Sequence, residues 1–557
     1  MNRKAALLIA LLTFLAFLPS LQNGFVNWDD PSFILEIRQL RSLSLANIKS
    51  YFTSTVQRIY VPLTLLSFAI EHSLFGFNPF GFHLTNILLH VIVTLLVFRL
   101  GIYFGLSTTA SALGALVFGI HPMHVESVAW ITERKDLLYS VFYMIAVIYY
   151  FRYLGEIRHD CGGTGGQVFF RKRFYLFTVI FGLLSILSKP MALSLPLIFF
   201  VLDWFSGRKF TRAAFLDKAV HFVYIMPVAF ITYSCHMRIP GEGILKSLNV
   251  WVWTLTFYLK KFFLPLSFVP LYRLPSAFSP EYILSWAIFI SMIAALFYYR
   301  KNRWVLFSFL FFFVSIFFLL RFDNRADTSI VADRFMYLPS VGFCLLAGMV
   351  LDLVLKEMSI KKAWAKGLVM IAFGMLFMLL FAKTWSQNRI WRNSGTLWTS
   401  VLDFYPDSPD AHNNLGSHYL DRGELEQAMA EFYLTSYLKP GEKLAYYNMA
   451  EVFYRRNQLS RAIELYTKTL SLDPGYAPAY NNRGNMYLLS GLSNEAISDY
   501  SRAIALDPEY IDAFINRSTA YMLLQDDENA LNDLDKVLSL DSENKTAIMK
   551  KNQFINR

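Results

Sequence analysis

The chain has 557 residues, of which 55% are hydrophobic and 17% aromatic, and its mean hydropathy is +0.37. This composition is too apolar for one soluble core and indicates a membrane protein. The net charge of +11 does not indicate nucleic-acid binding, because the basic residues gather in short loops between apolar runs. The three cysteines, Cys161, Cys235 and Cys344, follow no C-x-x-C spacing, which argues against a disulfide framework and a zinc site.

The first apolar run lies between residues 5 and 21, after a basic start. Because no clear small-x-small cleavage site follows it, we expect an uncleaved membrane anchor rather than a signal peptide. With its basic end inside, the run leads outward to the segment NGFVNWDDPSFI. The Asp29–Asp30 pair in this segment indicates either a functional site or a helix N-cap before a proline-led turn.

Ten further apolar runs are predicted to cross the membrane. They are 83–104, 107–120, 137–151, 174–188, 190–205, 219–235, 281–299, 303–320, 335–354 and 364–383. The loops 152–173 and 206–218 are basic, as cytoplasmic loops are. The runs 61–75 and 250–271 are expected to be interfacial or re-entrant. The sequence therefore predicts eleven spans, with the N-terminus inside and the C-terminus outside.

From residue 409 the sequence repeats every 34 residues, in units that span 409–442, 443–476, 477–510 and 511–544. A helix-packing alanine and a closing proline recur at fixed offsets, as at Ala428 and Pro440. This is the pattern of the tetratricopeptide (TPR) repeat, a pair of antiparallel helices. We therefore expect a membrane domain over 1–384, a connector over 385–408, a TPR α-solenoid and a capping tail over 545–557.

Each repeat has an asparagine at the same position: Asn414, Asn448, Asn482 and Asn516. Stacked repeats would align these side chains along the concave groove. A primary amide both donates and accepts hydrogen bonds, so such a row could bind the backbone of an extended peptide. Asparagine is also common at this position without any ligand, and the pattern leaves both interpretations open. In either case the array is expected to bind protein.

Ionisable side chains are concentrated in the segments predicted to lie outside, and such residues in a membrane protein indicate function by default. Besides the aspartate pair, the candidates are His121, His124, Glu126, Arg134, Lys189 and Arg334. A metal site at His121, His124 and Glu126 is not favoured, because HPMH contains a proline and is not a helical i,i+4 pair. We expect these three residues to orient the aspartates or a substrate instead.

Several of these motifs together resemble the TMTC proteins and their bacterial relatives. They are W-D-D after the first helix, PLT with a following FG-N-P-FGFH-N-LLH run, an HP-H-E loop and an R-YLPS-G helix start, followed by TPR repeats. The resemblance implies an all-α, polytopic membrane bundle of the GT-C architecture. It also implies an inverting glycosyltransferase, similar to the protein O-mannosyltransferases. Such an enzyme would move mannose or another hexose from a polyprenyl-phosphate carrier to Ser or Thr of extracytoplasmic proteins.

This chemistry assigns a role to each candidate. An acceptor hydroxyl needs a base, and the resemblance favours Asp30 slightly over Asp29. The leaving lipid phosphate gathers negative charge, which Arg334, Arg134 and Lys189 are expected to stabilise. The lipid-linked sugar is a substrate, no cofactor is identified, and a divalent metal is not favoured.

Two other functions compete with this interpretation. A non-catalytic membrane anchor could present the TPR array as a scaffold for an envelope complex, and it could lose Asp29 and Asp30 without consequence. A transporter would place charge near the bilayer midplane, whereas here the charge lies mostly at the outer ends. The compact loops and the DRFMYLPS form favour a bacterial inner membrane with a periplasmic array, and the endoplasmic reticulum is the alternative.

Overall fold

The computed structural model describes residues 2–159, 165–235, 244–276, 279–320, 330–360 and 363–555. The chain forms two compact units, Met1–Leu397 and Trp398–Arg557. Within the described residues every named element is helical, and the one β-bridge, between Val56 and Ile59, is isolated. The predicted all-α class is therefore confirmed.

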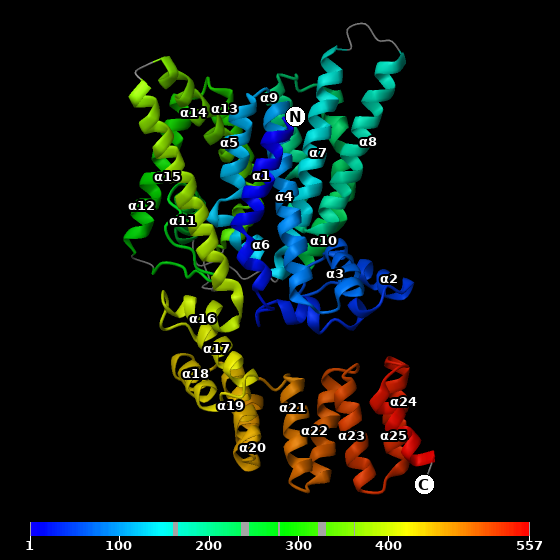
Figure 1. The fold of residues 1–557 in the computed structure, drawn as a ribbon. Helices are drawn as coiled ribbons and strands as arrows, with labels where there is room; N and C mark the ends of the chain where they lie inside the picture. Colours follow the sequence, from blue (N-terminus) through cyan, green and yellow to red (C-terminus); the bar gives the residue numbers. More distant parts are fainter. Residues whose placement is uncertain are drawn as a thin grey trace. The chain divides into compact units, whose positions relative to one another are not determined.

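Long helices run side by side through the first unit (Figure 1). They are α1 (Arg3–Ala16), α4 (Pro79–Tyr103), α5 (Thr108–Gly119), α7 (Arg134–His159), α8 (Gly165–Ser188), α9 (Leu195–Ser206), α10 (Arg212–Cys235), α11 (Ile244–Phe263), α12 (Pro280–Tyr298), α13 (Arg303–Ile316), α14 (Ser340–Ile360) and α15 (Ala363–Asn388). Shorter pieces at one end of the bundle include α2 (Leu45–Thr53), α3 (Pro62–Phe75) and α6 (Val125–Ala129). Each of the eleven predicted apolar runs overlaps a helix of this set.

The number of helices that could cross a membrane is smaller than the number of helices in the first unit. In the described part of the chain, five helices are long and apolar enough to cross a membrane: Pro79–Tyr103, Ile131–Ile157, Arg212–Ser234, Pro280–Tyr298 and Gly367–Arg392. A sixth arises if α5 and Pro122–Ala129, bent by 50°, form one broken span. Other helices are short: α1 and α13 have 14 residues each, against the roughly 20 that a span needs. The predicted count of eleven is therefore not confirmed.

Small residues bring α5 and α14 into close contact. A Cβ atom on Gly348 would lie 2.2 Å from the Ala110 carbonyl oxygen, and one on Gly114 would lie 2.7 Å from the Cys344 carbonyl oxygen. Such glycines let two helix backbones approach in an apolar environment. This packing brings the loop after α5 next to the segment that precedes α14.

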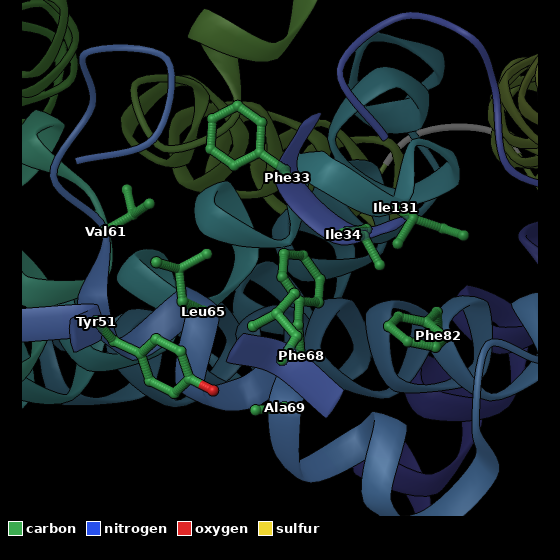
Figure 2. Packing of buried hydrophobic residues seen from close by; sticks show 10 residues of the cluster. Phe33, Ile34, Tyr51, Val61, Leu65, Phe68, Ala69, Phe82 and Ile131 are labelled. Atoms are coloured by element: carbon green, nitrogen blue, oxygen red, sulfur yellow. The ribbon is translucent and has the colours of Figure 1, made fainter. Parts of the chain in front are cut away.

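A buried apolar cluster anchors the segment that follows the aspartate pair. Phe33 and Ile34 pack with residues of α2, α3 and α4 and with Ile131 (Figure 2). The other buried members are Leu40, Tyr51, Val61, Leu65, Phe68, Ala69 and Phe82. Burial of this apolar surface holds the loop that follows α1 against the start of α7.

The second unit is a row of helix pairs, each beginning 34 residues after the one before. The pairs are α17 (Pro409–Asp421) with α18 (Leu425–Leu438), α19 (Lys443–Arg455) with α20 (Leu459–Leu472), α21 (Ala477–Leu489) with α22 (Ser493–Leu506), and α23 (Ile511–Leu523) with α24 (Asp527–Leu540). The first helix of every pair is followed by a residue with positive φ: Gly423, Asn457, Gly491 and Gln525. The next helix, α25 (Lys545–Ile555), starts one period after α23 and takes the place of the predicted capping tail.

Each helix pair closes around a small residue. A Cβ atom on Gly416 would lie 2.6 Å from the Phe432 ring, and one on Gly484 would lie 2.7 Å from the Tyr500 ring. The equivalent position carries Ala450 in the second pair, where it packs in a cluster with Tyr466. The repeated sequence pattern thus corresponds to a repeated packing contact.

Candidate active site

The two adjacent aspartates have different environments. Asp30 is fully buried, and its carboxylate accepts hydrogen bonds from the Val26 backbone N–H at 2.8 Å and from the Thr132 N–H at 3.2 Å. The Thr132 hydroxyl donates a further hydrogen bond to it. Burial raises the pKa of Asp30 to about 6, although these hydrogen bonds oppose the rise. Asp30 therefore joins the loop that follows α1 to the segment before α7.

Asp29 is only partly buried and lies among charged groups. Burial raises the pKa of Asp29, while Lys135, Arg334 and Lys189 lower it and Glu133 raises it. A carboxylate in this position is reachable from solvent and has a proton affinity above that of an ordinary aspartate. Both properties suit a general base.

Glu133 is the centre of the charged cluster. Its carboxylate lies 3.1 Å from Lys135 Nζ, 3.1 Å from Lys189 Nζ and 3.3 Å from Arg334 Nε. Lys189 Nζ also lies 2.6 Å from Asp136 Oδ1. Burial lowers the pKa of Lys189, but Asp136 and Glu133 outweigh that effect and raise it, so the ammonium group stays charged. Sequence analysis had singled out neither Glu133 nor Lys135 as a site residue.

Arg334 is the most accessible cation of this cluster. Its guanidinium forms an ion pair with Glu126, and its backbone N–H donates to Glu126 Oε2 at 3.0 Å. Burial lowers the pKa of Arg334, but Glu126 and Glu133 raise it further, so it is permanently charged. Its side chain is 15% exposed, against 8% for Lys189 and 4% for Lys135. The structure thus brings Asp29, Glu126, Lys189 and Arg334 together from four separate segments.

His121 and His124 hold the loop that carries Glu126. His121 Nε2 lies 3.1 Å from the Phe262 carbonyl oxygen, and its Nδ1 accepts a hydrogen bond from the Met123 N–H. His124 Nδ1 lies 2.8 Å from the Phe118 carbonyl oxygen, and its Nε2 lies 3.0 Å from Ser340 Oγ. Protein atoms thus engage both nitrogens of each ring. No group of three metal-ligating side chains occurs in the described residues.

Arg134 lies in a different buried cluster. It pairs with Glu71, and it donates from Nε to Asn86 Oδ1 at 2.9 Å and from a terminal nitrogen to the Phe82 carbonyl oxygen at 2.9 Å. Its guanidinium also lies 4.7 Å from the centre of the Phe68 ring. Only 1% of the side chain is exposed. Because these contacts engage Arg134 in helix packing, we leave it out of the donor-binding site.

Three tryptophans stack beside Asp29. The Trp28 and Trp130 rings are 4.8 Å apart, and the Trp130 and Trp391 rings are 5.3 Å apart. The backbone is joined at the same place, because the Gly24 N–H donates to the Arg392 carbonyl oxygen at 2.9 Å. The loop that carries Asp29 is therefore fixed to the segment that follows α15.

An apolar cavity of about 360 Å³ lies beside His121. It is lined by α5, by the end of α11, and by α14 and α15, with Val117, Phe262, Phe343, Leu346 and Leu380 among its residues. Nearly all of the lining is apolar. Such a cavity suits a hydrocarbon chain.

In the repeat array the predicted asparagine row is half-buried and takes part in packing. Asn448 Nδ2 donates to Asn413 Oδ1 at 3.0 Å, Asn482 to the Tyr447 hydroxyl at 2.8 Å, and Asn516 to Asn481 Oδ1 at 2.9 Å. Each of these bonds reaches the preceding repeat, whereas Asn414 donates to its own helix, to the Asp410 carbonyl oxygen. Asn482 Oδ1 also accepts a hydrogen bond from Asn481 Nδ2 at 3.1 Å, so both ends of that amide take part in packing.

Comparison with known proteins finds similarities to both units of the chain. TPR family models match residues 392–443, 477–510 and 511–544, so the repeats are confirmed. The Caenorhabditis elegans protein O-mannosyl-transferase F38B6.6 is 25% identical over 453 residues, covering 75% of this chain and 58% of its own. Human protein O-mannosyl-transferase TMTC4 is 25% identical over 445 residues, covering 68% and 58%.

The chain is thus similar to TMTC proteins over most of its length. It spans little more than half the length of these two relatives, 58% in each case. Among solved structures, that of the MamA protein is similar over 27% of this chain and 82% of its own, at 23% identity and a TM-score of 0.25. We infer nothing further from that likeness.

The TMTC resemblance and the geometry select overlapping residues. The resemblance assigns roles to Asp30, Asp29, Arg334, Arg134 and Lys189. Of these, Asp29, Lys189 and Arg334 lie in or beside the cluster around Glu133, whereas Arg134 pairs with Glu71. Glu133 and Lys135 were missed because the run TERKD also suits a charged helix end at the membrane surface. The sequence feature that could have indicated these two residues is the unbroken series of four charged residues in TERKD.

Proposed function

We propose that this chain is an integral-membrane glycosyltransferase that moves a hexose, with mannose as first choice, from a polyprenyl-phosphate donor to Ser or Thr hydroxyls of proteins outside the membrane. The observation that carries the proposal is the position of Asp29. It combines a partly exposed carboxylate of raised pKa with the three cations Lys135, Lys189 and Arg334. The names of the TMTC relatives, protein O-mannosyl-transferases, support the same reaction class.

In the proposed reaction Asp29 takes the proton of the acceptor hydroxyl. The hydroxyl oxygen then forms a bond to the anomeric carbon while the bond from that carbon to the phosphate oxygen breaks, which inverts the anomeric centre. The departing phosphate keeps the electron pair, and its charge is stabilised by Arg334 and then by Lys189. Asp30, which accepts three hydrogen bonds, positions the loop and does not act as the base.

The remaining candidates support these groups. Glu126 and Glu133 hold Arg334 and Lys189 at one place, and His121 and His124 position the Glu126 loop. We assign the first isoprene units of the donor to the apolar cavity beside His121. No step of this mechanism needs a metal ion.

We propose that the TPR array recruits the acceptor protein, with Asn414, Asn448, Asn482 and Asn516 facing its backbone. The membrane domain is assigned to 1–384, with 385–408 as a connector and 409–544 as the four repeats. We place the chain in a bacterial inner membrane, with the array on the periplasmic side. The endoplasmic reticulum stays the second choice.

The test is sugar transfer by the full chain in lipid nanodiscs. Polyprenyl-phosphate mannose and polyprenyl-phosphate glucose, each labelled in the sugar, are supplied with periplasmic proteins cross-linked to the chain. We expect label in protein, released by β-elimination as an O-linked sugar, and its loss in Asp29→Asn. Protein capture without transfer from either donor would favour the scaffold over the enzyme.

A further inference from the structure

Two turns of the repeat array carry exposed leucines. They join α21 to α22 in the third repeat and α23 to α24 in the fourth. Leu489 and Leu523 end the first helix of each pair, and these residues are 60% and 63% exposed. Leu492 in the first turn and Leu524 in the second are exposed as well. Exposed apolar side chains that gather on one surface indicate a binding site.

The array provides its own comparison for these leucines, because all four turns have the same backbone. In each repeat the N–H of the sixteenth residue donates to the carbonyl oxygen of the eleventh at 2.9 Å. The thirteenth residues of successive repeats are Asp421, Arg455, Leu489 and Leu523, and the sixteenth residues are Glu424, Gln458, Leu492 and Asp526. Since charged or polar side chains occupy both positions in the first two repeats, the fold of the turn does not require leucine.

The leucines of the two turns lie close enough to bind one partner. Helices α21 and α23 are in contact, and helices packed together lie about 8–10 Å apart. Leu489 and Leu523 occupy equivalent positions on them, so their separation is similar. Side chains at positions i and i+7 of a helix are about 10 Å apart along its axis. One helix laid across the two turns could therefore contact both leucines.

The charge around the leucines is negative. Glu495, Asp527 and Glu528 are exposed in the first turn of the helices that follow the two turns. The third and fourth repeats together contain twelve acidic and four basic residues, and two of the basic ones, Arg483 and Arg517, are paired with aspartates. Carboxylates in a first turn also stabilise a helix, but the leucines beside them do not. A second copy of this surface would bring like charges together, whereas a basic partner would be attracted.

We infer that Leu489, Leu492, Leu523 and Leu524 form a docking surface for a basic amphipathic helix of a partner protein. The apolar face of that helix would cover the leucines, and its lysine or arginine side chains would face the carboxylates. The inference does not rest on the proposed reaction, because the surface would bind such a helix whether or not the partner receives a sugar.

The experiment measures binding of a model helix to the full chain in phosphatidylcholine nanodiscs. The probe is a fluorescent peptide of about 18 residues, with leucines at the i, i+3, i+4, i+7 spacing and lysines on the other face. A second peptide keeps the leucines and replaces every lysine with glutamate. Fluorescence anisotropy gives Kd, and empty nanodiscs give the binding to lipid, which is the same for every variant of the chain.

The leucines are tested with a matched pair of variants. Leu489→Ser/Leu523→Ser should weaken binding of the lysine peptide about tenfold, because two apolar contacts are lost. Leu434→Ser/Leu438→Ser on α18, where the leucines are 40% and 37% exposed, should leave Kd unchanged. All four substitutions are at exposed positions, and thermal unfolding verifies that each variant is folded.

The carboxylates are tested in a chain that keeps its leucines. Asp527→Asn/Glu528→Gln should weaken binding about threefold and reduce its dependence on salt. Glu464→Gln/Glu509→Gln removes the same amount of charge from exposed positions elsewhere on the array and should have no such effect.

Three results would overturn the inference. They are binding no stronger than that of empty nanodiscs, equal loss of binding in the two leucine variants, and equal binding of the glutamate peptide. Self-association of the chain that Leu489→Ser/Leu523→Ser abolishes would also overturn it, because a second copy would then be the occupant. No sugar transfer is measured, so failure here leaves the proposed enzyme untouched, and a chain that binds the peptide but transfers no sugar leaves the docking surface untouched.

Discussion

The two units of the molecule arrange their charged residues in opposite ways. In the array, Arg483 Nε lies 2.7 Å from Asp499 and its NH1 lies 3.0 Å from the Thr467 hydroxyl. One repeat later, Arg517 pairs with Asp533 and Ser501 in the same arrangement. In the first unit the cluster around Glu133 occurs once, and its members come from segments as far apart as residues 29 and 334.

This difference shows where function is concentrated. A repeated ion pair serves stability, and losing one copy leaves the others in place. A largely buried cluster of seven charged side chains is costly to assemble and adds nothing to helix packing that apolar residues could not supply. We therefore expect substitutions in the array to change stability or acceptor binding, and substitutions in the cluster to change the rate of transfer.

Outside the aspartate pair, the largest effect should follow the loss of Arg334. Arg334→Gln should lower the rate of transfer by about 10²–10³, because the charge that develops on the leaving phosphate loses its most accessible cation. The matched change in the array, Arg517→Gln, should cost about 1 kcal/mol of unfolding free energy and leave the rate per folded molecule unchanged. Initial rates and thermal unfolding of both variants test this. Equal losses of rate in the two variants would contradict the claim that the cluster, and not the array, determines the rate of transfer.

The rate of transfer should also depend on pH. The base acts as a carboxylate, and burial raises the pKa of Asp29 above its ordinary value of 3.8. As the pH falls through this raised pKa, the rate should fall about tenfold per unit. The raised pKa of Lys189 keeps that cation charged at neutral pH, so it adds no loss there. A pH profile of kcat, with a stable fold verified at each point, would contradict this account if it stayed flat down to pH 3.8.

A smaller effect is expected from the packing of the repeats. Gly484→Val should lower the free energy of unfolding of the array by about 1–3 kcal/mol, because its side chain would collide with the Tyr500 ring. Gly441→Val is the control, since a Cβ atom there meets nothing within 4 Å. Chemical denaturation followed by circular dichroism measures both. Equal destabilisation of the two variants would refute the packing argument.

The smallest effect should appear in acceptor binding. The pair Asn448→Ala/Asn482→Ala removes two amides of the predicted row and should weaken binding of an acceptor protein about two- to tenfold. Asn529→Ala, whose amide donates to Asp526 at the N-terminus of the same helix, α24, should leave binding unchanged. A direct measurement of Kd would show that the row has a packing role alone if both variants bound like the original chain.

The repeats could be predicted from the sequence because the same residue type recurs at the same position of successive repeats. Gly416 and Gly484 face aromatic rings at the same offset, so the 34-residue period alone identified the helix pairs. In the first unit the apolar runs identified helices, but not how many cross a membrane, because helices such as α13 are short.

The site was harder to predict because its contacts are long-range. Nothing near Asp30 in the sequence shows that Thr132, 102 residues later, engages its carboxylate. On that contact rests our proposal that Asp29, and not the slightly favoured Asp30, is the base. The sequence also does not show that Arg134 and Lys189 lie in different clusters. The residues that bind Arg134, Glu71 and Asn86, belong to α3 and α4, far from it in the sequence.

The central claim is the division of labour within the aspartate pair, and one comparison of variants tests it directly. Transfer from labelled polyprenyl-phosphate mannose is measured for Asp29→Asn and Asp30→Asn, together with donor binding and thermal stability. We predict that Asp29→Asn lowers kcat by about 10²–10⁴ and leaves stability and donor binding nearly unchanged. Asp30→Asn should lose about 1–3 kcal/mol of stability while its folded fraction keeps most of the activity. An active Asp29→Asn chain beside an inactive, stably folded Asp30→Asn chain would contradict the account.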